Sequence, residues 1–543
     1  MIMMKQWKQR NLLYWLMFFS VLCVGGFFDW GTALLGSIVC TAAAVRAIRN
    51  PHTGWIYGKW IWLLLLQELC LVLGIFSAVD RGMALAGVIR FLSVIGWMFL
   101  CVQYTQKDRE CALDAIPHAG CVMTAVSLAG YLLPALQSRL WVAQRMGGFF
   151  QYPNTCAIFL LIGLLYINGR RTRTAVFQWC ILFWGILLTG SRTAMILMAG
   201  VLVINFIRQD RFMRRLIGFN ILAAVAAGAG MVILTGSYQN LARLATVFSS
   251  NSTFWGRLLY WQDALRMIVG APLGLGYRGY VYLQPVVQRG VYATLYVHND
   301  FLQCFLDGGW IAGLALGSLM VYQLKHSRYR VILMVVFLHC MADFDLQFVS
   351  IWFAVLLLFD YGEEVKENTK IFRIASRICM IPAAVVCLYF LVPFAAEYLS
   401  HYEMAEDWYP YYTTAKEKIL YYITDTDAAL SQADEILAYN PYVSLAWEVK
   451  AQAAFEAGDI RGYAENKERV LAIERYDITQ YEDYVRCLEQ YKRYAEESGD
   501  MDTVRLCEEK CASVPGMLSD LEKQTSLLAW KLRDQPVFVL SAE

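Results

Sequence analysis

The stretch GKWIWLLLLQELCLVLGIFSA, residues 58–78, is apolar over almost its whole length. A helix needs about 20 such residues to cross the hydrocarbon core of a bilayer. Comparable stretches recur through the first 396 residues, with short polar segments between them. The sequence therefore predicts an all-α fold, a polytopic transmembrane helical bundle of about 12–13 spans. The predicted spans are residues 11–28, 31–47, 58–78, 82–104, 114–134, 154–168, 175–190, 193–207, 216–235, 301–323, 331–345, 346–360 and 375–396.

Charge divides the 543-residue chain at about residue 396. The whole chain is 58% hydrophobic and 17% charged, whereas soluble domains are about 25% charged. Residues 1–396 hold 32 Lys and Arg against 16 Asp and Glu, a net charge of +16, and residues 397–543 hold 15 against 29, a net charge of −14. This composition excludes a single globular core, a disordered chain and a secreted disulfide scaffold. It predicts a membrane domain over 1–396 and a soluble α-helical domain over 397–543.

Lys and Arg predict which side of the membrane each loop faces, because cytoplasmic loops are enriched in them. With the N-terminus inside, the positive charges fall on alternate loops along the whole bundle, and the long segment 236–300 lies outside. The loops predicted to be inside carry Arg46 and Arg49; Lys107 and Arg109; Arg170, Arg171 and Arg173; Arg208, Arg211, Arg214 and Arg215; Lys325, Arg328 and Arg330.

Asp343 and Asp345 decide the end of this topology. They fall in the middle of residues 331–360, and one carboxylate at the centre of a span costs about 2.5–3.5 kcal/mol. Two spans joined by a turn place both carboxylates at the outer surface instead. This arrangement puts the C-terminal domain outside.

The C-terminal domain shows a repeat of 34 residues. Leu437 is followed by Leu471, and Trp447 by Tyr481, each 34 positions later. The pattern resembles tetratricopeptide units, which are helix pairs that stack on one another. We expect a docking surface for a protein partner or a substrate; the alternative is a helical cap that only stabilises the membrane domain. Neither domain shows ligands at metal-binding spacing, so we expect no metal site and no cofactor.

The turn Thr189-Gly190-Ser191-Arg192 lies between two predicted spans on the outer side. An Arg is disfavoured there, and its planar fork of donors matches phosphate oxygens. We expect Arg192 to bind the phosphate of a membrane lipid. The alternative is an Arg whose charge extends to the membrane interface without binding a ligand.

The outer segment 236–300 is the only long connection in the predicted bundle, and such loops are usually functional. It contains Arg257, the glycine-rich turn APLGLGYRGY at 271–280 with Arg278, and His298-Asn299 at its end. A His at an outer interface can act as a base near neutral pH. The alternative for His298-Asn299 is a polar cluster that caps the next helix. Asn154, after Gly148 and before the sixth span, has structural and functional interpretations of equal weight.

Taken in order, these segments resemble the O-antigen ligase and O-antigen polymerase family of membrane glycosyltransferases. The resemblance covers about residues 60–360, and the order and membrane placement of its short motifs make it specific. The matching motifs are Gly148 to Asn154, Thr189-Gly190-Ser191-Arg192, Arg257 with Trp261, Pro272-Leu273-Gly274-Leu275-Gly276, His298-Asn299 with Leu302-Gln303, Gly308-Gly309 to Gly313, and Asp343-Phe344.

The resemblance implies a GT-C-like glycosyltransferase that works outside the cytoplasm without metal or nucleotide sugar. Its donor is a glycan on undecaprenyl diphosphate. It implies that Arg192 and Arg257 hold the diphosphate and that His298 acts on the acceptor, with Arg278 a further candidate by position. Supporting roles are expected for Asn154, Ser191, Asn299 and Asp343.

Several readings stay open at this point. The acceptor is a lipid, a polymer or a protein, so ligase and polymerase are not separated, and no nucleic acid is expected as a partner. A transporter or flippase for the same lipid is a second possibility, although residues 1–396 show no internal repeat. A non-catalytic scaffold is a third. The expected location is the cytoplasmic, or inner, membrane of a bacterium.

Overall fold

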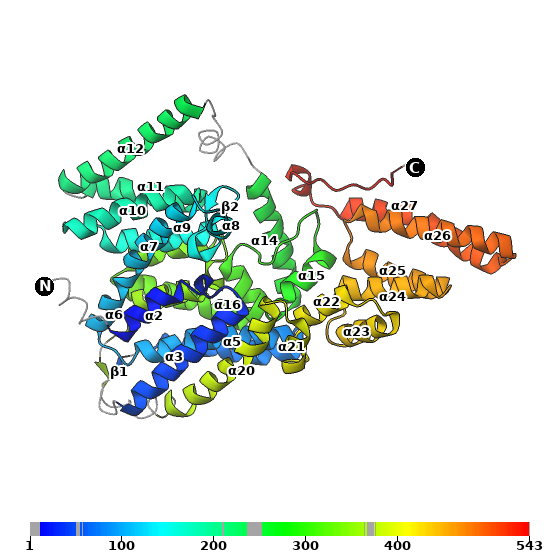
Figure 1. Ribbon diagram of the computed structural model, residues 1–543, viewed down its shortest axis with the longest axis horizontal. Helices are drawn as coiled ribbons and strands as arrows, with labels where there is room; N and C mark the ends of the chain where they lie inside the picture. The colour runs from blue at the N-terminus through cyan, green and yellow to red at the C-terminus, as the bar shows by residue number, and fades with distance from the viewer. Residues whose placement is uncertain are drawn as a thin grey trace.

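The computed structural model describes residues 11–49, 55–56, 58–208, 211–235, 252–362, 364–365, 374 and 376–541, and the chain is almost entirely helical (Figure 1). The only strands in these ranges form two short antiparallel pairs: β1 (Trp55–Ile56) with β4 (Glu364–Val365), and β2 (Trp141–Val142) with β3 (Arg145–Met146). Part of the predicted outer segment, residues 236–251, lies outside the described residues.

Most of the helices belong to one bundle that precedes the C-terminal domain. They are α2 (Leu12–Ser20), α3 (Asp29–Arg49), α4 (Ile61–Gly74), α5 (Arg81–Cys101), α6 (Gln106–Leu113), α7 (Ala115–Gly130), α8 (Pro134–Leu140), α9 (Pro153–Ile167), α10 (Arg173–Thr189), α11 (Arg192–Arg208), α12 (Arg211–Thr235), α14 (Ser252–Gly270), α15 (Gly279–Val287), α16 (Asp300–His326), α17 (Arg330–Cys340), α18 (Val349–Leu358) and α20 (Met380–Tyr398). The tail, residues 399–541, contains α21 (Tyr402–Trp408), α22 (Thr413–Tyr422), α23 (Thr426–Tyr439), α24 (Ser444–Glu456), α25 (Ile460–Ile473), α26 (Ile478–Ser498) and α27 (Met501–Gln524).

Five helices among the described residues are long and apolar enough to cross a membrane, judged by length and composition. Six shorter apolar helices of 10–17 residues accompany them. Each of the thirteen predicted spans contains a helix, so the prediction of an all-α, polytopic membrane protein is confirmed. The five long helices are Asp29–Arg49, Arg81–Cys101, Gln106–Gly130, Asp300–His326 and Ser376–Tyr398.

Helices α2, α17 and α18 are much shorter than the spans predicted for them. The first, α2, ends at Ser20 because Gly25 and Gly26 follow with positive φ angles of 64° and 70°, which a helix does not accommodate. The helices α17 and α18 have 11 and 10 residues, and each therefore reaches only about half of the roughly 30 Å hydrocarbon thickness. The turn between them is largely buried inside the protein.

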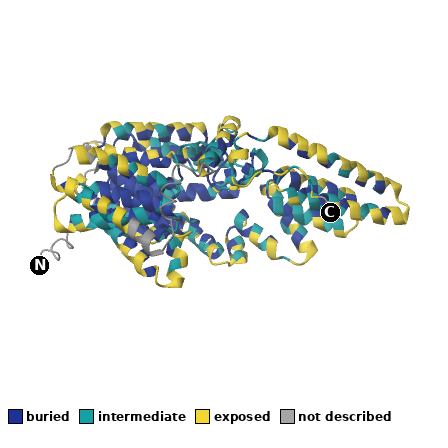
Figure 2. Cartoon of the chain, turned by 90° about the horizontal axis from the view of Figure 1, so that it is seen from above, coloured by how far each residue is buried: buried dark blue, intermediate teal, exposed yellow. Residues whose placement is uncertain are grey.

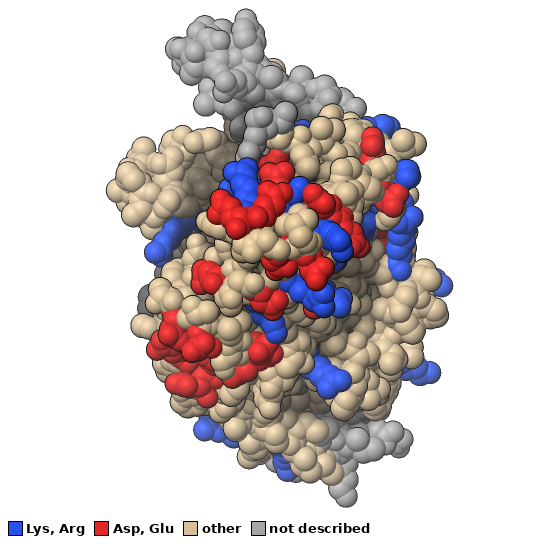
Figure 3. Space-filling view, turned by 90° about the vertical axis from the view of Figure 1, so that its right-hand side faces the viewer, with Lys and Arg blue, Asp and Glu red and all other residues tan. Residues whose placement is uncertain are grey.

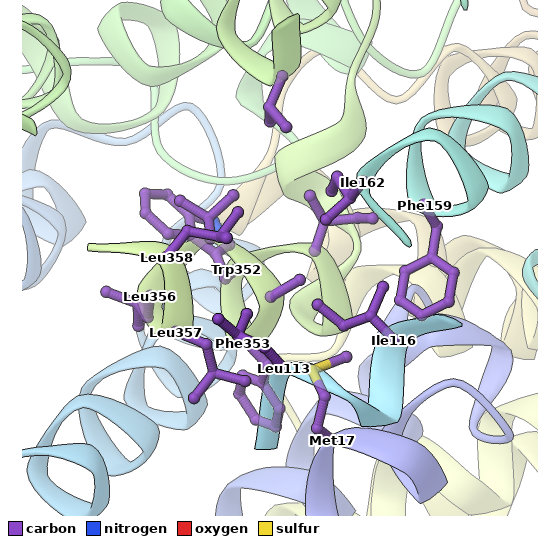
Figure 4. Packing of buried hydrophobic residues seen from close by; sticks show 14 of the residues in the cluster. Met17, Leu113, Ile116, Phe159, Ile162, Trp352, Phe353, Leu356, Leu357 and Leu358 are labelled. Carbon is purple, nitrogen blue, oxygen red and sulfur yellow. The ribbon is translucent and has the colours of Figure 1, made fainter. Parts of the chain in front are cut away.

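Helix α18 forms the centre of the bundle. All ten of its residues are buried. Buried residues concentrate in the bundle, away from the C-terminal tail (Figure 2). Trp97 of α5 stacks on Phe353 with 4.4 Å between ring centroids, and its indole nitrogen donates to the Phe353 carbonyl oxygen at 3.1 Å. Side chains from α2, α6, α7 and α9, such as Met17, Leu113 and Phe159, surround the same helix (Figure 4).

Loops that the charge rule assigns to the cytoplasm meet at one end of the bundle. Arg170 pairs with Asp114 at 2.9 Å, and Arg328 pairs with Glu110. Helix α6, which carries Glu110, lies at the left end of the bundle in Figure 1, whereas α14, α15 and the tail lie at the right end. The tail therefore extends from the end of the bundle opposite to these basic loops.

The tail is a stack of antiparallel helices with its own core. Helix α24 packs against α25, and α26 against α27, around buried side chains such as Tyr463, Tyr484 and Leu488. Acidic and basic side chains intermingle on its far end (Figure 3). The helix pairs are compatible with the expected repeat, and their identity as tetratricopeptide units stays a prediction.

Asp80 fixes the tail to the bundle. Its carboxylate caps α5 by accepting from the Met83 backbone nitrogen at 2.9 Å, and it accepts from Thr413 at 2.5 Å and Asn440 at 3.1 Å in the tail. At Gly82, an added Cβ atom would lie 1.8 Å from the backbone oxygen of Tyr411. The contact between tail and bundle is thus close enough to require glycine.

Gly82→Ala is expected to loosen the tail, because relieving this overlap costs about 1–3 kcal/mol. Limited proteolysis of the purified protein should release the tail sooner, and the melting temperature should fall. Gly200→Ala is the matched control, since nothing lies within 4 Å of its Cβ position. Equal protease resistance of the Gly82 variant and the wild type would contradict this account.

Candidate active site

The carboxylate of Asp343 gathers the candidate site. It lies in the turn between α17 and α18 and is buried. One oxygen accepts from Tyr152 at 2.8 Å and lies 3.2 Å from Nδ1 of His298. The other accepts from Asn154 at 2.6 Å and from Nη2 of Arg257 at 3.2 Å. Four side chains from distant parts of the sequence therefore meet at one acidic group.

Helix ends place these groups. Asn299 caps α16, because its side-chain oxygen accepts from the backbone nitrogens of Phe301 at 3.0 Å and Leu302 at 3.1 Å. Its amide also donates to the Met341 carbonyl oxygen at 3.0 Å. Asn299 therefore holds the start of α16 against the turn that carries Asp343, and its capping role, one of the two alternatives, is what the structure shows.

His298 adopts a backbone conformation that is uncommon for residues other than glycine. Its φ is 53°, in the left-handed region, and such strain clusters at functional sites. Trp261 on α14 donates to its carbonyl oxygen at 3.3 Å, and Phe344 packs edge-on against its ring at a centroid distance of 5.0 Å. These contacts fix the imidazole, of which 22% of the side-chain surface is exposed.

The buried carboxylate of Asp343 is surrounded by partners that favour its charged form. Burial alone would raise its pKa, but the hydrogen bond with His298 and the positive charge of Arg257 together lower the pKa below its ordinary value. In the tautomer that carries its proton on Nδ1, His298 donates a hydrogen bond to this carboxylate, and the lone pair of Nε2 is free.

Arg192 and Arg257 approach each other through α14. Nη2 of Arg192 donates to the Thr253 hydroxyl at 3.3 Å. Thr253 and Arg257 are four residues apart on α14 and therefore share a face of the helix. Ser191 is buried, and its backbone nitrogen donates to the Thr189 hydroxyl at 3.2 Å. The turn therefore points Arg192 toward the helix that carries Arg257.

Arg145 and Tyr152 belong to the site but were not predicted. Arg145 donates to the Thr189 carbonyl oxygen at 2.8 Å and to the Asn154 side-chain oxygen at 2.7 Å, so it links the turn before Arg192 to the Asp343 group. Arg145 lies in a predicted outer loop, where a positive charge is as unusual as it is at Arg192. Tyr152 lies within the quoted motif Gly148 to Asn154, but nothing in that motif singles it out.

Arg278 lies in a second polar cluster and does not contact Asp343. Its guanidinium lies 5.4 Å from the ring centroid of Tyr277 and 6.0 Å from that of Tyr296. In the same cluster Asp29 pairs with Arg90 at 2.7 Å and accepts from Tyr277 at 3.1 Å. The structure therefore separates Arg278 from the other predicted site residues.

The two carboxylates of the turn have different partners, because Asp343 pairs with Arg257 and Asp345 pairs with a histidine. Asp345 lies 2.5 Å from Nδ1 of the buried His339 and accepts from Thr155 at 2.8 Å. Ligand atoms of Asp300, Cys340 and Asp345 lie within 4.8 Å of one another. The expected absence of a metal site consequently stays a prediction.

Asp343→Asn is expected to lower the free energy of unfolding by about 2 kcal/mol at neutral pH, the contribution of hydrogen bonds to a charged group. A carboxyl whose folded pKa is lowered stabilises the protein above its unfolded pKa of about 3.9, and this stabilisation disappears as the pH falls through the folded value. The difference in melting temperature between wild type and variant should therefore be constant above about pH 5 and shrink below pH 4. Asp502→Asn, at a side chain 97% exposed, is the control; a constant difference at every pH would refute the ionised state.

The chain is similar to one family of known proteins. A family model described as O-antigen ligase matches residues 176–317, a range that includes Arg192, Arg257, Arg278 and His298. No curated protein matches the chain. The predicted resemblance to the O-antigen ligase and polymerase family is confirmed over this range, where the chain is similar to the O-antigen ligase family.

Proposed function

We propose that this protein transfers a glycan from an undecaprenyl-diphosphate-linked donor to an acceptor at the outer face of the bacterial cytoplasmic membrane. The ligase domain supports glycan transfer in general. The observation that carries the finer proposal is the joining of His298 and Arg257 by the single carboxylate of Asp343. A base and a diphosphate ligand are thereby held at a fixed separation, which a two-substrate transfer requires.

Arg257 and Arg192 bind the diphosphate of the donor in this proposal. Nη2 of Arg257 donates to Asp343, whereas Nε of Arg257 is buried and has no hydrogen-bond partner among the described residues. Arginine presents several donors in one plane, which suits phosphate oxygens. Two guanidinium groups supply the stabilisation of the departing diphosphate, and we therefore propose that the reaction needs no metal.

His298 activates the acceptor. Its Nε2 takes the proton of the acceptor hydroxyl as that oxygen bonds to the anomeric carbon of the donor sugar. The bond from this carbon to the diphosphate breaks, and undecaprenyl diphosphate leaves with the bonding electrons. General base catalysis of this kind contributes about 10²–10⁴-fold. A single in-line displacement would invert the configuration at the anomeric carbon.

The proposed reaction takes place at the end of the bundle where the tail is attached. The site residues come from α14, the start of α16 and the turn between α17 and α18. The basic loops at the opposite end favour a cytoplasmic location for that end. The acceptor, whether another glycan repeat, a lipid or a protein, is not distinguished by this geometry.

Arg192→Ala, Arg257→Ala and His298→Ala should each abolish finished surface glycan in the native host, while lipid-linked glycan accumulates on the outer leaflet. Arg257→Lys should recover only part of the activity, because it keeps the charge but loses the planar fork. Both glycan pools are measured together with the amount of protein in the membrane. Arg139→Ala, an exposed residue at the end of α8, is the matched control.

Two outcomes would contradict this proposal. Donor that accumulates on the inner leaflet would indicate a transporter. Normal surface glycan in all three alanine variants would indicate that the Asp343 group is not the catalytic site.

A further inference from the structure

A cleft lined by basic residues lies between α14 and the tail. It has a volume of about 600 Å³, and four of its lining residues are cationic, whereas none is acidic. Two of these cations come from the bundle and two from the tail. They are Arg266, Arg289, Arg475 and Lys523.

This concentration of positive charge is unexpected in the tail. Residues 397–543 hold 29 Asp and Glu against 15 Lys and Arg, yet Arg475 and Lys523 both line the cleft that faces α14. Neither Arg266 nor Arg475 forms an ion pair with any acidic side chain in the described part of the chain. The cleft therefore keeps a net positive charge.

Two carboxylates near the cleft leave this charge in place. Asp263 is buried and binds Nε of Arg289 at 2.9 Å, and its other oxygen accepts from Tyr292 at 2.9 Å. Nη2 of Arg289 is buried and has no hydrogen-bond partner among the described residues. Asp520 pairs with Lys523 at 2.8 Å, but both side chains are 70% exposed, so solvent screens this pair. An unpartnered buried guanidinium nitrogen is a donor that a bound anion would satisfy.

Hydrogen bonds between the bundle and the tail hold the walls of the cleft in place. Arg475 donates to the Val286 carbonyl oxygen at 2.8 Å and to Gln524 at 2.7 Å. The Ser526 backbone nitrogen donates to the Arg289 carbonyl oxygen at 2.9 Å, and its hydroxyl donates to Gln262 at 3.3 Å. The walls are therefore fixed by hydrogen bonds between bundle and tail before any ligand enters.

Helix α14 carries both Arg257, which is proposed to bind the donor diphosphate, and one wall of the cleft. Arg257 and Arg266 are nine residues apart on α14, which is about 13 Å along the helix axis. Gln262 and Arg266 share a face that points toward the tail, whereas Trp261 contacts His298. A chain that leaves the reaction centre along α14 would meet the cleft within a short distance.

We propose that this cleft binds the anionic groups, carboxylate or phosphate, of an acidic glycan that is the substrate of the transfer. The proposal rests on the proposed function and defines its substrate class. Several separated cations fit several charges along a chain better than one isolated ion. The side-chain amide nitrogens of Gln262 and Gln524, whose oxygens take part in the wall contacts, add donors for sugar hydroxyls. The tail then serves as one wall of the substrate site.

The test is a direct binding measurement on the full-length protein in neutral detergent. The probes are a fluorescently labelled hexamer of galacturonic acid, a glycerol phosphate oligomer of similar length and the neutral hexamer of maltose. We expect saturable binding of one or both anionic probes, a fall in affinity with salt, and no binding of the neutral probe.

Arg266→Gln and Lys523→Gln should each lower the affinity for the anionic probe about tenfold, and the double variant about a hundredfold, as expected for the loss of charge-assisted hydrogen bonds. Arg505→Gln, on α27 with a side chain 78% exposed, is the matched control. Neither substituted residue of the cleft belongs to the Asp343 group, so folding and the proposed active site should stay intact.

Three outcomes would overturn the inference: equal binding of the neutral hexamer, unchanged affinity in the double variant, or competition by phosphatidylglycerol vesicles that shows a lipid headgroup site instead. Arg257→Ala separates this result from the proposed function. It should keep the binding of the hexamer in the cleft while glycan transfer is lost, so either claim can fail alone.

Discussion

The buried carboxylate of Asp343 is the interaction on which the site depends. It neutralises Arg257, orients His298 and accepts hydrogen bonds from Tyr152 and Asn154. An ion in such a place is tolerated only when its hydrogen bonds are satisfied. The turn that carries Asp343, the start of α16 and the start of α9 must consequently keep fixed positions. The short helices α17 and α18 flank this turn and hold it in the interior of the bundle.

The tail belongs to the same construction. Asp80 links α5 to Thr413 and Asn440, and Arg475 links the tail to α15. Helix α14 connects the two regions, because Arg257 on it contacts Asp343 while Gln262 contacts Ser526. The C-terminal domain, which the sequence predicts as a separate soluble domain, is thus packed directly against elements that form the candidate site.

Much of the architecture was predictable from the sequence, since helix formation and membrane burial follow from local apolar length. The same holds for Arg192, Arg257 and His298, because their positions at the outer end of a predicted span or in the long outer segment 236–300 are a local signal. Pairings between distant residues carry no such signal. Spacing in the sequence does not predict the contact between Tyr152 and Asp343, which lie 191 positions apart. It also does not predict the pairing of Asp345 with His339 or the position of Arg278 in the Asp29 cluster. The lengths of α17 and α18 were also missed, because hydropathy does not reveal that neighbouring helices bury a turn.

The most direct test of the central claim is reconstitution. The purified protein, in vesicles that contain an undecaprenyl-diphosphate-linked glycan and an acceptor, should release undecaprenyl diphosphate in step with the formation of glycosidic product. His298→Ala should lower this rate by about 10²–10⁴-fold, the contribution of a general base. Movement of the donor across the bilayer without its cleavage, or equal release by the wild type and the His298 variant, would contradict the account.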